Sequence, residues 1–163
     1  MLRRWGYRVA YRILQLYWLL ASPDQRGVKC LLTDGDRVLL VRHTYGSRAW
    51  DLPGGSLKRD ELPLSAARRE MEEELGQGDA DWVSLGAIRG RMHRRHDAIE
   101  VFGAEVSRPD LRLDLGELAV AAWFEVDRLP LEVGPYVAPI IAGTRRYTGR
   151  PATPTRSSPE AYS

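Results

Sequence analysis

The segment that most constrains this chain runs from residue 54 to residue 76 and reads GGSLKRDELPLSAARREMEEELG. Pro63 and Gly76 are typical of the first turn and the C-terminal cap of a helix, so the sequence predicts a helix from about Pro63 to Leu75. At about 100° per residue, four apolar side chains form one narrow stripe, which must face a core. The stripe consists of Leu64, Ala67, Met71 and Leu75.

Acidic side chains occupy an adjacent face of the same predicted helix. Glu70, Glu73 and Glu74 fall together there, whereas Glu72 points towards solvent. Clustered carboxylates repel each other, and a hard divalent cation such as Mg²⁺ or Mn²⁺, which prefers oxygen ligands, resolves that repulsion. Many Glu-rich helices are simply solvated faces, so these three glutamates alone do not decide between the two interpretations.

The neighbourhood of these glutamates favours the metal site. Arg69 lies one turn before Glu73, so it can pair with that carboxylate and fix its rotamer. Glu61, just before the helix, can join the cluster from the loop. The glycine turn at residues 54–55 lets the backbone approach a metal ion or phosphates without obstruction by side chains.

The complete spacing resembles a known motif. Gly55, five residues, Glu61, seven residues, Arg69-Glu70-Met71, one residue, Glu73-Glu74, one residue and Gly76 is similar to the Nudix box, with Gln77 where that family usually has an aliphatic residue. LLVRH and LPGG before the helix, and AAWFEVDRLP after it, extend the resemblance from about residue 27 to residue 130. The resemblance implies an α+β fold with a mixed sheet sandwiched between helices, here over residues 23–144.

The resemblance also implies residue roles and an activity. Arg69 would orient the glutamates, and Glu61 would be an ancillary carboxylate. The metal ligands would be Glu70, Glu73, Glu74 and the backbone carbonyl of Gly54. The activity would be hydrolysis of a phosphoanhydride bond in a nucleoside diphosphate linked to another group. The alternative is an inactive Nudix-fold module that only binds nucleotides.

The general base is a separate question, because in this family it varies and often comes from a loop outside the box. Glu117, six residues before Trp123, stands where such a residue is often found, and it is predicted to be the base or an extra ligand. Glu70 is the alternative base. Glu117 as a solvated loop charge is the competing interpretation.

The choice among substrate classes is narrowed only by sub-family sequence markers that this chain lacks. The chain has no proline about fifteen residues beyond the box, no nearby tyrosine and no SQPWPFPxS array, which mark hydrolases of ADP-ribose, dinucleoside polyphosphates and NADH. Nucleoside triphosphates, including oxidised ones, and nucleotide sugars remain. Arg42, Arg91 and Arg95 are predicted to bind substrate phosphates, although residues 89–96 also suit a solvated basic loop.

Apolar runs on either side of the helix predict the strands. Val28–Thr33 and Val38–His43 flank Asp34-Gly35-Asp36, which is a strong hairpin signal. Further strands are predicted over residues 82–89, 99–106 and 119–126, with a short helix over 135–142. The Pro-, Thr- and Ser-rich residues 145–163 are predicted to be disordered.

Residues 1–22 predict an amphipathic helix, because apolar side chains recur at helical spacing beside Arg4, Arg8 and Arg12. We expect it to pack on the domain or on a second subunit of a homodimer; docking on a membrane surface and a cleaved signal or anchor are the less favoured alternatives. A net charge of +2 predicts no stable nucleic-acid binding. The single Cys30 lies in an apolar run, so a buried free thiol and a cytoplasmic location are expected.

Overall fold

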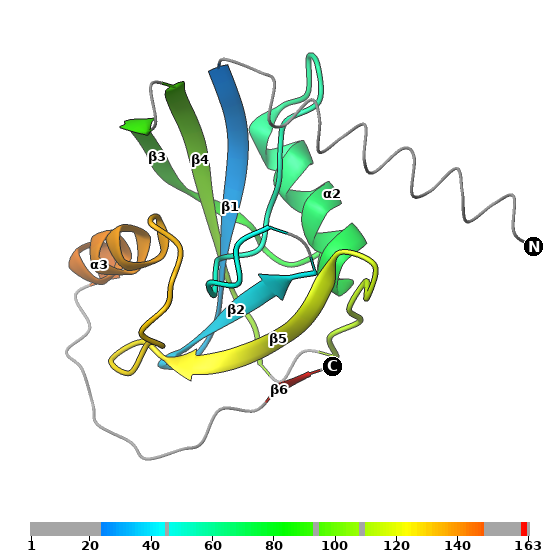
Figure 1. Ribbon diagram of the computed structural model, residues 1–163, viewed down its shortest axis with the longest axis vertical. Coiled ribbons are helices and arrows are strands. Elements are labelled where there is room, and N and C mark those ends of the chain that lie inside the picture. The colour runs from blue at the N-terminus through cyan, green and yellow to red at the C-terminus, as the bar shows by residue number, and fades with distance from the viewer. Residues whose placement is uncertain (1–23, 45, 93–94, 108–109, 149–160, 163) are drawn as a thin grey trace, which may run out of the picture.

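The computed structural model describes residues 24–44, 46–92, 95–107, 110–148 and 161–162 of the chain. One sheet runs through it, with strand order β3-β4-β1-β2-β5-β6 (Figure 1). Its strands are β1 (Asp24–Asp34), β2 (Arg37–His43), β3 (Val83–Met92), β4 (Arg95–Glu105), β5 (Leu118–Glu125) and β6 (Ala161–Tyr162). β1 and β4 run parallel and the other neighbours antiparallel, so the sheet is mixed.

The predicted hairpin joins β1 to β2. Gly35 takes the left-handed conformation, with φ +60°, and Thr33 pairs with Val38 beside the turn. Arg37 donates to the Asp34 carboxylate across the turn at 2.6 Å. The Asp-Gly signal therefore placed this connection correctly.

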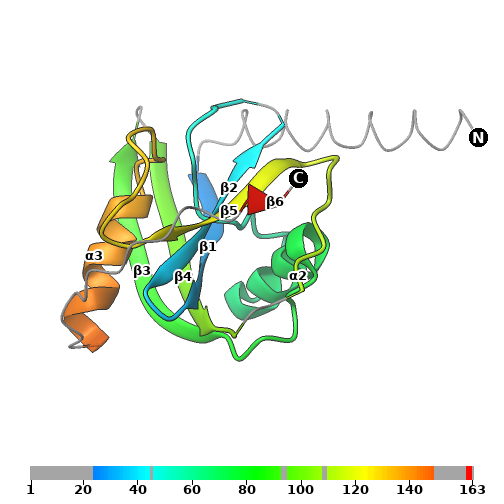
Figure 2. The same ribbon diagram turned by 90° about the horizontal axis from the view of Figure 1, so that it is seen from below.

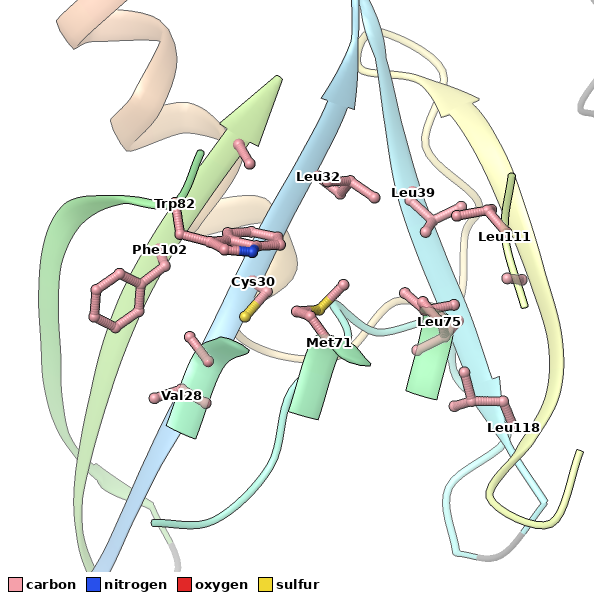
Figure 3. Packing of buried hydrophobic residues seen from close by; sticks show 14 of the residues in the cluster. Val28, Cys30, Leu32, Leu39, Met71, Leu75, Trp82, Phe102, Leu111 and Leu118 are labelled. Atoms are coloured by element: carbon pink, nitrogen blue, oxygen red, sulfur yellow. The ribbon is translucent and has the colours of Figure 1, made fainter. Parts of the chain in front are cut away.

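Two helices, α2 (Pro63–Leu75) and α3 (Val137–Thr148), lie on opposite faces of the sheet (Figure 2). Val28, Cys30 and Leu32 of β1 point to the α2 face and pack against Met71 and Leu75 (Figure 3). The intervening side chains face α3, and the core there contains Leu31, Val38, Leu40, Val137, Ile140 and Ile141. Both faces are covered, which explains the uninterrupted apolar run of β2 and confirms the predicted α+β sandwich.

The helix α2 has the predicted bounds, and Gly76 ends it in the left-handed conformation, with φ +67°. The predicted apolar stripe was wrong at its first member, because Leu64 is 38% exposed. Ala66 and Glu74 are buried in addition to Ala67, Met71 and Leu75. The buried arc is therefore centred closer to the carboxylate face, and one glutamate lies inside the core rather than beside it.

The ends of the chain differ from expectation where they are described. The helix α3 begins at Val137 and runs to Thr148, beyond the predicted 135–142. Ala161–Tyr162 pairs with β5 instead of standing free, so residues 145–163 are not disordered throughout. The predicted amphipathic helix over residues 1–22 lies outside the described residues. No helix among the described residues has the length and apolar character needed to cross a membrane.

Candidate active site

The glycine turn is fixed to two strands by backbone hydrogen bonds. Val28 N donates to Gly55 O at 2.8 Å and Cys30 N to Pro53 O at 2.9 Å. On the other side, Asp51 exchanges two backbone hydrogen bonds with Val41. Gly54 has φ +133°, and a Cβ there would lie 2.3 Å from Val28 O, so only glycine fits this close approach.

Glu74 is the buried carboxylate of the site. The residue is 2% exposed, and its Oε2 accepts a hydrogen bond from Gly54 N at 3.2 Å. Burial raises the pKa of Glu74 to about 8, and the charges of Glu70 and Glu117 act in the same direction. A buried carboxylate beside two others is unfavourable on its own, and a bound cation would offset that cost.

Glu70 lies next to it, over the glycine turn. A Cβ on Gly55 would be 2.5 Å from the Glu70 carboxyl carbon, so the glycine leaves the space that this carboxylate fills. Burial raises the pKa of Glu70, against the opposing hydrogen bond from Arg69. Glu70 and Glu74 thus converge on the turn as two poorly hydrated carboxylates.

Arg69 donates hydrogen bonds to three of the acidic residues. Its Nε and Nη2 donate to the two Glu61 oxygens at 2.8 and 2.9 Å, and its Nη1 donates to Glu70 at 2.7 Å. Nη1 also reaches Glu73, at 3.4 Å, and Nη2 reaches the Ser56 carbonyl, at 3.2 Å. Hydrogen bonds from Arg69 are the main cause that lowers the pKa of Glu61 to about 2. The bidentate partner is Glu61, and the expected pair with Glu73 is the longest of these contacts.

Glu73 differs from its neighbours in depth, since its side chain is 57% exposed. Within the part of the chain that the structure describes, no group of three or more acidic, histidine or cysteine side chains is arranged to hold a metal ion by itself. The donor set still suits a hard cation: two desolvated carboxylates, an exposed third one and a backbone turn, all oxygen ligands. Arg69 and Gly54 N satisfy the same carboxylates in this arrangement.

The segment before β5 carries Glu117 to this site. Asp114 N donates to Glu74 O at 3.0 Å, and Thr44 N donates to Glu117 O at 2.9 Å. The Glu117 charge is close enough to raise the pKa of both Glu70 and Glu74. The structure thus brings together residues 43 positions apart along the chain, and Thr44 is an anchor with no sequence signal of its own.

Of the three arginines predicted to bind the substrate, the structure describes the side chain of one. Arg42 stands at the end of β2 with its guanidinium carbon 4.5 Å from the Trp50 ring centre. Strand alternation and the packing of Trp50 place it on the α3 face, away from the α2 carboxylates. Among the described residues its buried Nε has no hydrogen-bond partner. The side chains of Arg91 and Arg95 lie outside the described part.

An ion pair that the sequence did not reveal lies behind the turn. Lys29 Nζ is 2.8 Å from Asp51 Oδ2, and both side chains are mostly buried. Burial, with a further contribution from Lys29, lowers the pKa of the nearby His43. The one available hint was the acidic Asp51 directly before the LPGG turn.

Comparison with known proteins agrees with this geometry. The NUDIX domain model matches residues 23–142, most of the chain. This chain belongs to the Nudix family. It resembles the MutT protein from Methanosarcina mazei, with a TM-score of 0.67, 22% identity and coverage of 80% of this chain and 99% of that one. That likeness shows the fold.

Two curated relatives are more similar in sequence over shorter stretches. The RNA pyrophosphohydrolase of Saccharophagus degradans is 41% identical over 76 residues, which are 46% of this chain and 45% of that protein. The ADP-ribose pyrophosphatase of Mycobacterium tuberculosis is 31% identical over 94 residues, 55% of this chain and 45% of that protein. The chain therefore spans just under half the length of these two relatives.

Proposed function

We propose that this Nudix protein is a divalent-metal-dependent pyrophosphohydrolase that cleaves a phosphoanhydride bond in a nucleoside diphosphate joined to another group. The observation that carries the proposal is the buried Glu74 against Gly54, with the carboxylates of Glu70 and Glu117 close enough to raise its pKa. Folding gains nothing from this arrangement, whereas a cation and a diphosphate give it a use.

Glu70, Glu73, Glu74 and the Gly54 carbonyl would hold Mg²⁺ or Mn²⁺. When bound, the cation would neutralise the diphosphate oxygens and lower the pKa of the attacking water. Arg69 keeps Glu70 oriented while its remaining donors hold Glu61 and the Ser56 carbonyl. The protein's own contribution is thus a rigid set of oxygens at one end of α2.

The proton of the attacking water needs an acceptor among these side chains. Glu117 is our choice, because its segment is fixed to both Glu74 and Thr44. As the water oxygen bonds to phosphorus, its proton passes to the Glu117 carboxylate, the bridging P–O bond breaks and the leaving phosphate departs as an anion. Glu70 is the second candidate for this role, and removal of the Glu117 charge separates the two.

The names of two relatives support a wider range of candidate substrates. They refer to RNA and to ADP-ribose. ADP-ribose contains a phosphoanhydride next to a nucleoside, and an RNA does so when its 5′ end carries a triphosphate. We therefore add an RNA with a 5′-triphosphate and ADP-ribose to nucleoside triphosphates, oxidised nucleotides and nucleotide sugars. Arg42, whose buried Nε has no hydrogen-bond partner among the described residues, and the arginines Arg91 and Arg95 are proposed to bind the substrate. A nucleotide substrate and the buried free thiol of Cys30 favour a cytoplasmic location.

The test is a substrate panel run with protein stripped by EDTA and then supplied with Mg²⁺ or Mn²⁺, reading released phosphate, pyrophosphate and nucleotide. Glu74→Gln keeps the shape and the Gly54 hydrogen bond, so it should fold and lose turnover by orders of magnitude. Glu72→Gln is the matched control on the exposed side of α2 and should stay within a few-fold of the parent. Full turnover in EDTA, or near-normal turnover of Glu74→Gln, would contradict the proposal. Nucleotide binding without turnover of any substrate would instead favour the inactive binding module.

A further inference from the structure

Lys29 and Asp51 lie behind the glycine turn, on the face of the sheet opposite to α2. Strand alternation puts Lys29 on the α3 side of β1, between Val28 and Cys30, which face α2. Its ammonium group donates to Asp51 Oδ2 at 2.8 Å and to the Leu52 carbonyl at 2.9 Å. A single short segment of β1 therefore contacts the turn in two ways, through the backbone N–H groups of Val28 and Cys30 and through the Lys29 side chain on the α3 side.

The ammonium group binds the Leu52 carbonyl, which lies between two carbonyls that are held by backbone N–H groups. Asp51 O is held by Val41 N, Pro53 O by Cys30 N, and Leu52 O by Lys29 Nζ. One residue, Pro53, separates Leu52 from Gly54, whose N–H donates to Glu74. A shift of this carbonyl would be transmitted to Gly54 within two residues.

Asp51 completes the arrangement from the other side. Its Oδ1 accepts the Leu52 N–H at 2.8 Å, and a Cβ on Gly134 would lie 2.8 Å from its carboxyl carbon. Gly134 N donates to Trp50 O at 2.7 Å, so the segment before α3 closes over the carboxylate. The side chains of Lys29 and Asp51 are only 14% and 24% exposed, so water screens their attraction little.

We propose that the Lys29–Asp51 pair is a positioning device for the metal site, which sets the place of Gly54 and Gly55 against Glu74 and Glu70. This inference rests on the proposed function. Lys29 donates its hydrogen bonds to Asp51 and to the Leu52 carbonyl, so the pair positions the turn through its backbone. The Lys29 charge acts on Glu74 in addition, and lowers the pKa of that carboxyl. Groups that orient metal ligands without touching the metal typically change metal affinity about 10- to 100-fold when they are removed.

The experiment measures Mn²⁺ affinity by electron paramagnetic resonance on the full chain after removal of metal with EDTA. Lys29→Met and Asp51→Asn should each weaken Mn²⁺ binding about tenfold or more, and the double variant should add little to either. Asp51→Asn keeps an acceptor for Leu52 N–H, so it tests the pair even if Lys29→Met folds poorly. Arg37→Met is the matched control, because it breaks another part-buried ion pair of β1, with Asp34 at the β1–β2 hairpin rather than at the glycine turn.

Hydrogen–deuterium exchange of the peptide covering residues 52–57 is the second readout. It should be faster in Lys29→Met than in the parent and unchanged in Arg37→Met. Parent-like Mn²⁺ affinity in both pair variants would overturn the proposal, as would an equal loss in Arg37→Met. A rise in KM with unchanged Mn²⁺ affinity would also overturn it, because the pair would then contact the substrate. If the parent binds no Mn²⁺, the proposed function fails, and the exchange of the turn alone decides for or against the positioning role.

Discussion

The helices α2 and α3 cover opposite faces of one sheet, but they bury different kinds of side chain. On α3 the described buried side chains are Val137, Ile140 and Ile141, all apolar. On α2 the buried set includes Glu74, with Glu70 mostly enclosed beside it. The apolar face lowers the free energy of the folded chain by excluding water, whereas a buried carboxylate raises it unless a partner is bound.

The helix α2 therefore carries apolar side chains that stabilise the fold and, beside them, buried carboxylates that destabilise it. Met71 and Leu75 hold the helix on β1, and the carboxylates on its neighbouring face are kept in place by Arg69 and the glycine turn. Such a compromise between stability and activity is common at functional sites. Changes on the α2 side should therefore alter catalysis or its pH dependence, and changes on the α3 side should alter stability.

The largest effect is expected at Glu117, the proposed general base, whose charge raises the pKa of Glu70 and Glu74. Glu117→Gln should lower kcat by about 10²–10⁴-fold, because loss of a general base typically has that cost. KM and the melting temperature should change little, since the backbone contacts to Asp114 and Thr44 remain. Steady-state kinetics on the preferred substrate checks this. A kcat within a few-fold of the parent would move the role of base to Glu70.

The α3 face is tested by Ile140→Ala. Ile140 is 4% exposed, so its truncation should cost about 2–5 kcal/mol of unfolding free energy, measured by urea denaturation. Turnover per folded molecule should stay at the parent level. Leu131→Ala, at a fully exposed leucine, is the control and should stay within about 0.5 kcal/mol. A strong loss of turnover in folded Ile140→Ala would show that the two faces are not separate in function.

The pH dependence of stability sharpens the contrast. The folded-state pKa of Glu74, about 8, lies above its ordinary value of 4.5, so its contribution to stability is full below pH 4.5 and is lost as pH rises towards 8. Metal-free protein should therefore be less stable at pH 8 than at pH 5.5 by up to a few kcal/mol.

Subtracting the stability–pH profile of Glu74→Gln from that of the parent isolates the contribution of Glu74 from that of His43. The pKa of His43 is lowered, so its contribution changes stability in the opposite direction below about pH 6.5. Glu61 adds no slope in this window, because its pKa is lowered to about 2. Urea denaturation in EDTA is the measurement. Saturating Mn²⁺ should reduce the slope, and identical profiles for parent and variant would contradict the placement of Glu74.

The smallest effect is expected from removal of residues 149–163. Only the short pairing of Ala161–Tyr162 with β5 is lost from the described structure, so the melting temperature should fall by only a few degrees and turnover should be unchanged. A chain ending before Thr144 is the control, because it also removes the last part of α3, and it should be clearly less stable. Thermal denaturation of both truncated chains checks this.

The amino-acid pattern alone was enough to predict the elements that depend on local periodicity and turn chemistry. Pro63 and Gly76 bounded α2, Asp34-Gly35 located the first hairpin, and the box spacing put Arg69 with the glutamates. These features depend on residues within about ten positions of each other, where helical geometry and glycine conformations leave few alternatives.

The depth of each carboxylate, and the contacts that fix it, depend on how distant segments pack together. Glu73 and Glu74 are neighbours in the chain, yet one is exposed and the other is inside the core, because the rotation of α2 is set by its fit on β1. The same holds for Lys29 and Asp51, which meet because β1 and the turn are adjacent in the fold. Periodicity fixes which side chains share a face; contacts between distant segments decide which of them lose water.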